Sequence, residues 1–188
     1  SEPRITAHST CLIAQDTDLR GEITLSQGCI VHPRATIIAA SGPIIMDAGC
    51  VVEENAVILN RRKEVMRIGK GNQFMVGCRT SPSTASIVHP TVRAKYVGVE
   101  AASIGNHITF KPKSKVSSQI AVSDYCTFGP GTVTLASDPE STALETLEPY
   151  TVVYGSLSER RKWDGSAGET ERAVKDKERE YLREIMPK

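Results

Sequence analysis

Residues 11–37 read CLIAQDTDLRGEITLSQGCIVHPRATI, and this stretch decides the fold. An aliphatic residue stands at every sixth position, and the residue two places before each one is small or apolar. The aliphatic series is Ile13, Leu19, Leu25, Val31 and Ile37, and the preceding series is Cys11, Thr17, Ile23, Cys29 and Ala35. This period is too long for an α-helix or an alternating strand. It predicts hexapeptide repeats, in which each unit forms a short strand and a turn.

The same period runs through most of the chain. It resumes after an insertion that contains Gly42 and Pro43. The later aliphatic or aromatic positions are Met46, Val52, Ile58, Ile68, Phe74, Thr80, Ile104, Phe110, Val116, Val122, Phe128 and Thr134. The positions two before them are Ile44, Cys50, Ala56, Met66, Asn72, Cys78, Ala102, Ile108, Ser114, Ile120, Cys126 and Thr132. Three units would form one triangular coil of eighteen residues. We therefore predict an all-β solenoid, a left-handed parallel β-helix of hexapeptide repeats with a C-terminal α-helix, although spacing alone does not fix the hand.

The five cysteines follow the repeat. Their odd number and the lack of a Cys-x-x-Cys pair argue against a disulfide framework or a zinc ribbon. Cys11 and Cys29 are eighteen residues apart, and Cys50 follows by eighteen plus the three inserted residues. We expect these three to stack on one face, with Cys78 and Cys126 in the same small slot. A column on parallel strands offers no tetrahedral arrangement, so we interpret the thiols as buried packing groups, not metal ligands.

The chain is predicted to have two parts. Residues 1–156 form the β-helix, and residues 157–188 form a connector and an amphipathic C-terminal helix. Polar segments at 60–65 and 137–148 interrupt the period and are expected to be surface loops, and 81–98 is expected to be a distorted coil or protruding loop. The apolar residues of the helix are expected to pack on a solenoid wall: Val174, Tyr181, Leu182 and Ile185.

The charge balance and the short apolar stretches of the chain argue against nucleic acid and membranes as partners. With 23 Lys+Arg against 22 Asp+Glu, the chain has no overall basic field that would favour nucleic acid or an anionic membrane. Uncharged apolar stretches fall short of a membrane-spanning length, and residues 1–8 do not resemble a secretory signal. We expect a cytoplasmic protein that its partners recognise through local surfaces.

The four histidines allow two catalytic hypotheses. A zinc site of the γ-carbonic anhydrase type needs closely spaced histidines, whereas His8, His32, His89 and His107 include no pair five apart. His89 and His107 are eighteen apart and could stack on successive coils. An acyltransferase would need a positioned general base, for which His107 is the candidate. We expect neither chemistry, and hence no catalytic residue, metal or cofactor.

Several stretches carry a family resemblance. They are LRGEIT at 19–24, VHPRATII at 31–38, SGPII at 41–45, VEENAVILN at 52–60, Ile68-Gly69, Asn72, Phe74, VGC at 76–78, TVVYG at 151–155 and Arg160-Arg161. Their order and the helix after them resemble the dynactin subunit 6 family. The chain departs from that family's pattern in its short basic loop at 61–63 and in segment 81–98.

The resemblance implies a cytoskeleton-associated, non-enzymatic subunit of the dynactin pointed-end complex. Such a subunit would pair with dynactin subunit 5 and support dynein-driven cargo transport on microtubules. The alternative is a homotrimeric hexapeptide-repeat enzyme, either an acyltransferase or a γ-class carbonic anhydrase. The candidate partner-binding residues are Arg160, Arg161, Trp163 and Tyr181. The first three could instead brace the C-terminal helix.

Overall fold

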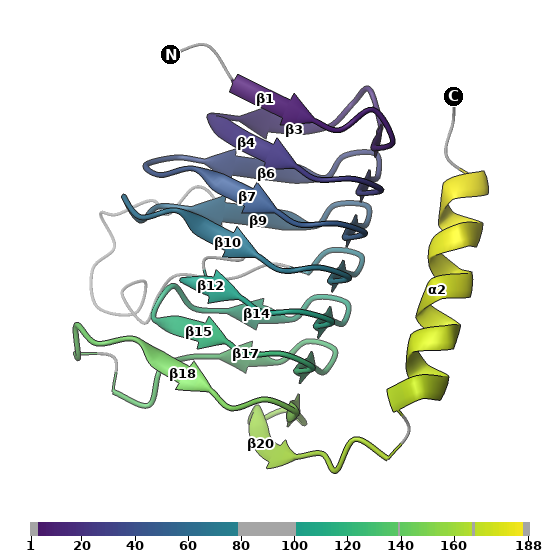
Figure 1. The fold of residues 1–188 in the computed structure, drawn as a ribbon. Helices are drawn as coiled ribbons and strands as arrows, with labels where there is room; N and C mark the ends of the chain where they lie inside the picture. The colour runs from purple at the N-terminus through teal and green to yellow at the C-terminus, as the bar shows by residue number, and fades with distance from the viewer. Residues whose placement is uncertain (1–3, 79–100, 139, 167, 186–188) are drawn as a thin grey trace.

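The computed structural model describes residues 4–78, 101–138, 140–166 and 168–185, which form a parallel β-solenoid followed by one helix (Figure 1). Sheet A stacks, in order, β1 (Arg4–Ala7), β4 (Glu22–Leu25), β7 (Ile44–Met46), β10 (Met66–Ile68), β12 (Ser103–Ile104), β15 (Ile120–Val122) and β18 (Glu145–Leu147). Sheet B stacks β2 (Leu12–Ile13), β5 (Ile30–Val31), β8 (Val51–Val52), β11 (Gln73–Phe74), β13 (Thr109–Phe110), β16 (Thr127–Phe128), β19 (Thr151–Tyr154) and β20 (Glu159–Lys162). The third wall contains β3 (Asp18–Arg20), β6 (Thr36–Ala39) and β9 (Val57–Asn60), and then β14 (Lys115–Val116) and β17 (Val133–Thr134).

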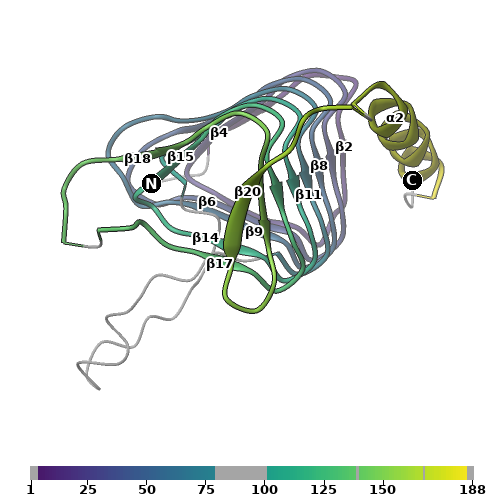
Figure 2. The same cartoon turned by 90° about the horizontal axis from the view of Figure 1, so that it is seen from below.

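The strand register confirms the predicted coil length. Ile13 pairs with Val31, and Val31 pairs in turn with Val52. These steps are the eighteen residues of one coil and the same eighteen plus the insertion. Seen along the stack, the coils enclose a roughly triangular interior (Figure 2).

In most repeats both positions point into that interior. From Leu25 to Phe128, the predicted aliphatic or aromatic positions within the described residues are all buried. In the later coils three aromatic rings stack: Phe74 on Phe110 and Phe110 on Phe128, each at 4.9 Å between centroids and tilted by 7° and 1°. Such stacking adds to the stabilisation from apolar burial. The interior is therefore a column of like residues repeated layer by layer.

The small slot also forms hydrogen bonds. The Cys29 thiol donates to the carbonyl of Asp47 at 3.2 Å, and the Cys50 thiol to that of Gly69 at 3.0 Å. Asn72 replaces cysteine in the next coil and donates through Nδ2 to the carbonyl of Gly105 at 2.8 Å. These slot residues thus donate to partly buried carbonyls at the turns of the following coil.

The expected burial of the cysteines is confirmed for Cys29, Cys50, Cys78 and Cys126. Cys11 is only partly buried because it lies in the first described coil, where no further coil covers it.

Asn60 joins the insertion to the loop at 61–65. Its Nδ2 donates to the carbonyls of Gly42, Pro43 and Glu64 at 2.9–3.0 Å, while its Oδ1 accepts the N–H of Arg62 at 3.0 Å. The side chain is 3% exposed. The expected surface loop is therefore anchored by a buried amide, and treating Asn60 as a surface residue was wrong.

Two strands lie where none was predicted. β18 falls inside segment 137–148, which was expected to be a loop, and Leu147 is buried in the core. β20 lies in the predicted connector and pairs antiparallel with β19. Ala101 is buried where Ala102 was expected, whereas Thr80 and segment 81–98 lie outside the described residues.

The C-terminal helix α2 (Gly168–Glu184) runs beside sheet B (Figures 1 and 2). Leu182 packs with Ala14, Ile30 and Val51 on the outward face of that sheet. Within the described residues, no helix is long and apolar enough to cross a membrane.

The predicted packing of the helix holds for Leu182 only. Val174, Tyr181 and Ile185 are 59%, 61% and 52% exposed, so the prediction was wrong for these three. The wall is faced instead by partly buried charged residues, among them Lys175 and Arg179. Long basic side chains cover apolar surface with their methylene stems while their charged ends reach the edge of the contact.

We predict that Ile37→Asp unfolds the protein. The side chain has no exposed surface, and an unpaired charge in this interior costs about 4 kcal/mol or more. Thr36→Asp on the same strand is the control, and it should change the free energy of unfolding by about 1 kcal/mol at most. Urea denaturation followed by circular dichroism measures both. A cooperative transition of the Ile37→Asp protein near that of the wild type would contradict the register.

Leu182→Ala should loosen α2 and lower the free energy of unfolding by about 1 to 2 kcal/mol, because apolar contact with sheet B is lost. Val174→Ala in the same helix should change it by less than about 0.5 kcal/mol, since that side chain is exposed. Amide hydrogen exchange of residues 168–185 reports the docking directly. Equal exchange in the two variants would show that Leu182 does not anchor the helix.

Candidate interaction surfaces

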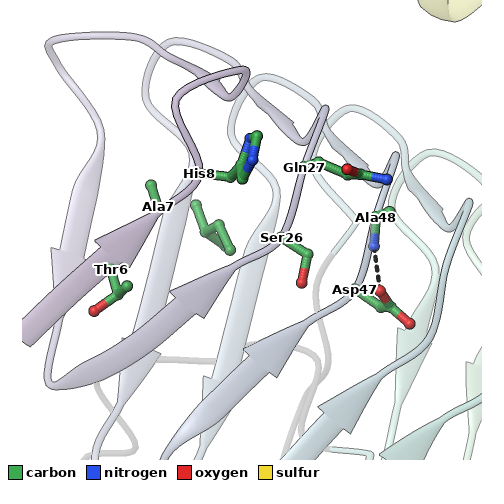
Figure 3. Close-up of a pocket in the computed structure, with 8 residues that line it drawn as sticks. Thr6, Ala7, His8, Ser26, Gln27, Asp47 and Ala48 are labelled. Carbon is green, nitrogen blue, oxygen red and sulfur yellow. Dashed lines mark hydrogen bonds between the residues drawn. The ribbon is translucent and has the colours of Figure 1, made fainter.

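A first groove lies at the corner between sheets A and B (Figure 3). It has a volume of about 410 Å³ and is lined by residues of three successive coils. They include Thr6, His8, Ser26, Gln27 and Asp47. In Figure 3, Ser26 and Gln27 lie between His8 and Asp47.

The polar groups of this first groove are engaged in their own turns. The backbone N–H of Thr10 donates to His8 Nδ1 at 3.2 Å, and Thr10 Oγ1 lies 2.9 Å from the same nitrogen. Nδ1 therefore accepts, which leaves the proton of the neutral imidazole on Nε2. Asp47 Oδ1 accepts the N–H of Ala48 at 2.7 Å. Both side chains stabilise turns, and this geometry does not align them as a general base with its carboxylate.

A second groove, the helix groove, lies between α2 and the side of the same corner that faces the helix. It has a volume of about 400 Å³. Three glycines line it on the solenoid side, and two arginines line it on the helix: Gly28, Gly49, Gly71, Arg179 and Arg183. Lys70 and His107 complete one end.

The residue at this corner changes from glycine to an aromatic residue along the solenoid. Backbone hydrogen bonds place Gly28, Gly49, Gly71, His107, Tyr125 and Tyr150 in register, one in each successive described coil. All six have φ between 55° and 70°. Glycine adopts this left-handed conformation without strain, whereas a residue with a side chain does so at a cost. The corners beneath the second half of α2 are therefore bare, because they are glycine. The corners of the later coils are ringed, because they carry aromatic side chains.

The ringed corners form an external aromatic ladder. His107 stacks on Tyr125 at 5.4 Å, and Tyr125 stacks on Tyr150 at 5.0 Å. Trp163 meets Tyr150 edge-on at 6.1 Å, and its backbone N–H donates to the Tyr150 carbonyl at 2.9 Å. The structure thus places His107, the candidate general base, at the top of a packing ladder.

The other histidines are spread over the described coils. His8 is exposed in the first groove, and burial lowers the pKa of the partly buried His32. Among residues 4–78, 101–138, 140–166 and 168–185, no three His, Cys, Asp or Glu side chains gather so that they could hold a metal ion. His89 lies outside those residues.

The predicted partner-binding residues occupy two separate places. Arg160 pairs with Glu145 and donates to the Leu135 carbonyl at 2.8 Å, while Arg161 lies over the Tyr154 ring at 5.3 Å. With Trp163, these residues gather at the last described coil and have contacts within the chain. Whether they also contact a partner stays a prediction.

Tyr181 lies on the solvent side of α2, far along the helix from that cluster. With Val174 and Ile185 it forms an exposed apolar stripe. Arg179 and Arg183 were not among the residues predicted from the sequence. The two arginines stand four residues apart and flank Leu182, and this spacing was the available signal.

Comparison with known proteins gives dynactin subunit 6 from several organisms. The protein of Nematostella vectensis is 29% identical over 161 residues, which cover 80% of this chain and 73% of the relative. That of Danio rerio is 28% identical over 162 residues, with 80% and 70% coverage. That of Caenorhabditis elegans is 33% identical over 110 residues, with 58% and 54% coverage. The chain is a relative of dynactin subunit 6. No model of a known protein family matches it.

A solved structure, that of a hexapeptide transferase family protein from Anaplasma phagocytophilum, shares the fold of this dynactin subunit 6 relative. The TM-score is 0.61, and the match covers 97% of this chain and 93% of that one. At 12% identity the likeness shows the fold alone. It confirms the predicted left-handed β-helix of hexapeptide repeats.

Burial also limits the reactivity of the cysteine thiols. A hydrogen bond with Cys50 lowers the pKa of the Cys29 thiol to about 7, but that side chain has no exposed surface for a reagent to reach. Burial raises the pKa of the Cys126 thiol to about 11 and raises those of Cys50 and Cys78 as well. The thiolate is the nucleophilic form, so these groups are unreactive at neutral pH.

We therefore predict that at pH 8 Ellman's reagent labels at most Cys11 rapidly in the folded protein, because that thiol lies in the exposed first coil. All five thiols should react in guanidinium chloride. The Cys11→Ser variant is the control, and it should lose the rapid phase. Rapid labelling of two or more thiols in the native protein would contradict the packing.

Proposed function

We propose that the chain is a non-catalytic assembly subunit of the dynactin complex, located at its pointed end and paired with dynactin subunit 5. In this role it supports dynein-driven cargo transport along microtubules and resides in the cytoplasm with the cytoskeleton. One observation carries the proposal. Dynactin subunit 6 sequences from five organisms match this chain, three of them over 80% of its length.

The described chemistry of the chain supports a role without catalysis. Four of its five thiols are buried packing groups, and the Cys29 and Cys50 thiols donate to turn carbonyls. His8 stabilises a turn, and His107 belongs to the aromatic ladder. The side chains most suited to nucleophilic or base catalysis therefore already have structural tasks.

The first described coil supports pairing with another β-helix. β1, β2 and β3 are each the outermost strand of their sheet. The core residues of this coil are only partly covered, as the partial burial of Ile5, Ile13 and Leu19 shows. An outermost strand offers backbone donors and acceptors to a further strand. A second parallel solenoid could extend all three walls at once.

The direction of the backbone N–H groups of β1 shows which of them could donate to a further strand. The N–H groups of Arg4 and His8 donate to the carbonyls of Gly21 and Leu25, in the second coil. Alternate residues of a strand direct their N–H to opposite edges, so that of Ala7 points away from β4.

The proposed function predicts that this chain and dynactin subunit 5, when co-expressed, elute as one complex with equal amounts of each. Size-exclusion chromatography with light scattering measures the mass. The alternative is a hexapeptide-repeat enzyme, since a transferase family protein shares the fold. It predicts instead a homotrimer at three times 20.4 kDa, with acyl transfer or carbon dioxide hydration. A stable homotrimer that ignores dynactin subunit 5 would refute the proposal.

Variants of Ala7 test the docking surface separately. Ala7→Pro removes only an N–H that faces away from β4, so the fold should survive while pairing weakens at least tenfold. Ala7→Val keeps the N–H and should pair like the wild type. If both variants pair equally well, the partner binds elsewhere, and the subunit role itself is untouched.

A further inference from the structure

The helix groove is hollow because its corners lack side chains. A Cβ atom built on Gly28 would lie 3.7 Å from Nη1 of Arg183, and one on Gly49 would lie 3.7 Å from the guanidinium of Arg179. Each arginine thus spans a bare corner. In the lower coils the equivalent positions are filled by His107, Tyr125 and Tyr150. The space is therefore specific to the coils whose corners are glycine.

The groove gathers positive charge. Arg179 and Arg183 line it from the helix, and Lys70 lines it from the solenoid. None of the nine described residues that line it is acidic. The formal charge of the whole chain is only +1, so this concentration is local. A concave site walled by protein strengthens the attraction of such charges for an anion.

The two guanidinium groups have unused donors. Each carries five N–H groups. Arg179 donates from Nη1 to Asp176 at 2.9 Å, and Arg183 donates from Nη2 to the neutral carbonyl of Thr10 at 3.2 Å. The Nε of Arg179 is buried and has no hydrogen-bond partner among the described residues. Leaving a charged donor buried and unpaired costs free energy.

These features fit phosphate better than a single carboxylate. Phosphate offers three acceptor oxygens and close to two negative charges at neutral pH, and guanidinium binds it in a forked geometry. Two arginines and a lysine that line one hollow of about 400 Å³ match that demand.

We propose that the helix groove is a phosphate-binding site, formed by Arg179 and Arg183 of α2, Lys70 of the solenoid and the bare glycine corners. The phosphate is carried either by a small molecule or by a phosphorylated side chain. Binding joins α2 to the coils it covers, so occupancy strengthens the docking of the helix.

The test titrates the full chain with sodium pyrophosphate at low ionic strength, using isothermal calorimetry and amide hydrogen exchange of residues 168–185. We expect saturable binding and slower exchange in α2. Arg179→Gln and Arg183→Gln should each weaken binding at least tenfold. Arg67→Gln, an exposed cation on β10, is the matched control and should bind like the wild type.

A second variant guards against loss of the helix contact. Ala48→Glu places a carboxylate at the rim while leaving the arginines and Leu182 in place, and it should also weaken binding at least tenfold. A phosphoserine peptide and its unphosphorylated form then distinguish the sources. Competition with pyrophosphate by the phosphorylated form alone indicates a protein-borne phosphate, and its absence indicates a small molecule. No binding of either probe, or equal binding by the wild type and the Arg179→Gln/Arg183→Gln double variant, would overturn the proposal.

Discussion

The structure depends on a narrow interior that each coil must fill in the same way. Two inward positions per wall are available, and their neighbours lie directly above and below on parallel strands. A large residue must therefore stack on a large one, as Phe74, Phe110 and Phe128 do. The second inward position must fit beside them, and in several coils it also supplies a donor to a turn carbonyl, as Cys50 and Asn72 do. The strand register, the packing of the interior and these hydrogen bonds therefore all depend on the same repeat of inward positions.

Much of this fold could be predicted from spacing, because the period of six records which side chains face inward. The period predicted the core from Leu25 to Phe128 and the coil of eighteen residues. It missed β18 because a charged residue, Glu145, stands two before Leu147 and an insertion shifts the count. It could not predict the donor role of the thiols, since spacing reports volume and not the direction of an S–H group.

The surfaces were harder to predict than the core. Reading α2 by polarity favoured Val174, Tyr181 and Ile185 as the packed face, yet their exposure shows the reverse. The stems of basic side chains cover the wall, and hydropathy scores those residues as polar. The helix groove was missed for the same reason, because it arises only where arginines of α2 meet glycines far away in sequence. The surface grooves of a solenoid depend on contacts between residues far apart in sequence. Which side chains face its interior is determined by the six-residue repeat itself.

The final strand has a consequence for solubility. Stacked parallel coils share their geometry with amyloid, and an uncovered end could recruit copy after copy. β20 reverses direction against β19, and its four residues, Glu159, Arg160, Arg161 and Lys162, are all charged and exposed. Another chain that tried to add there would meet a row of charges on a strand of the wrong polarity. β20 thereby opposes the stacking of a further parallel strand on sheet B at that end.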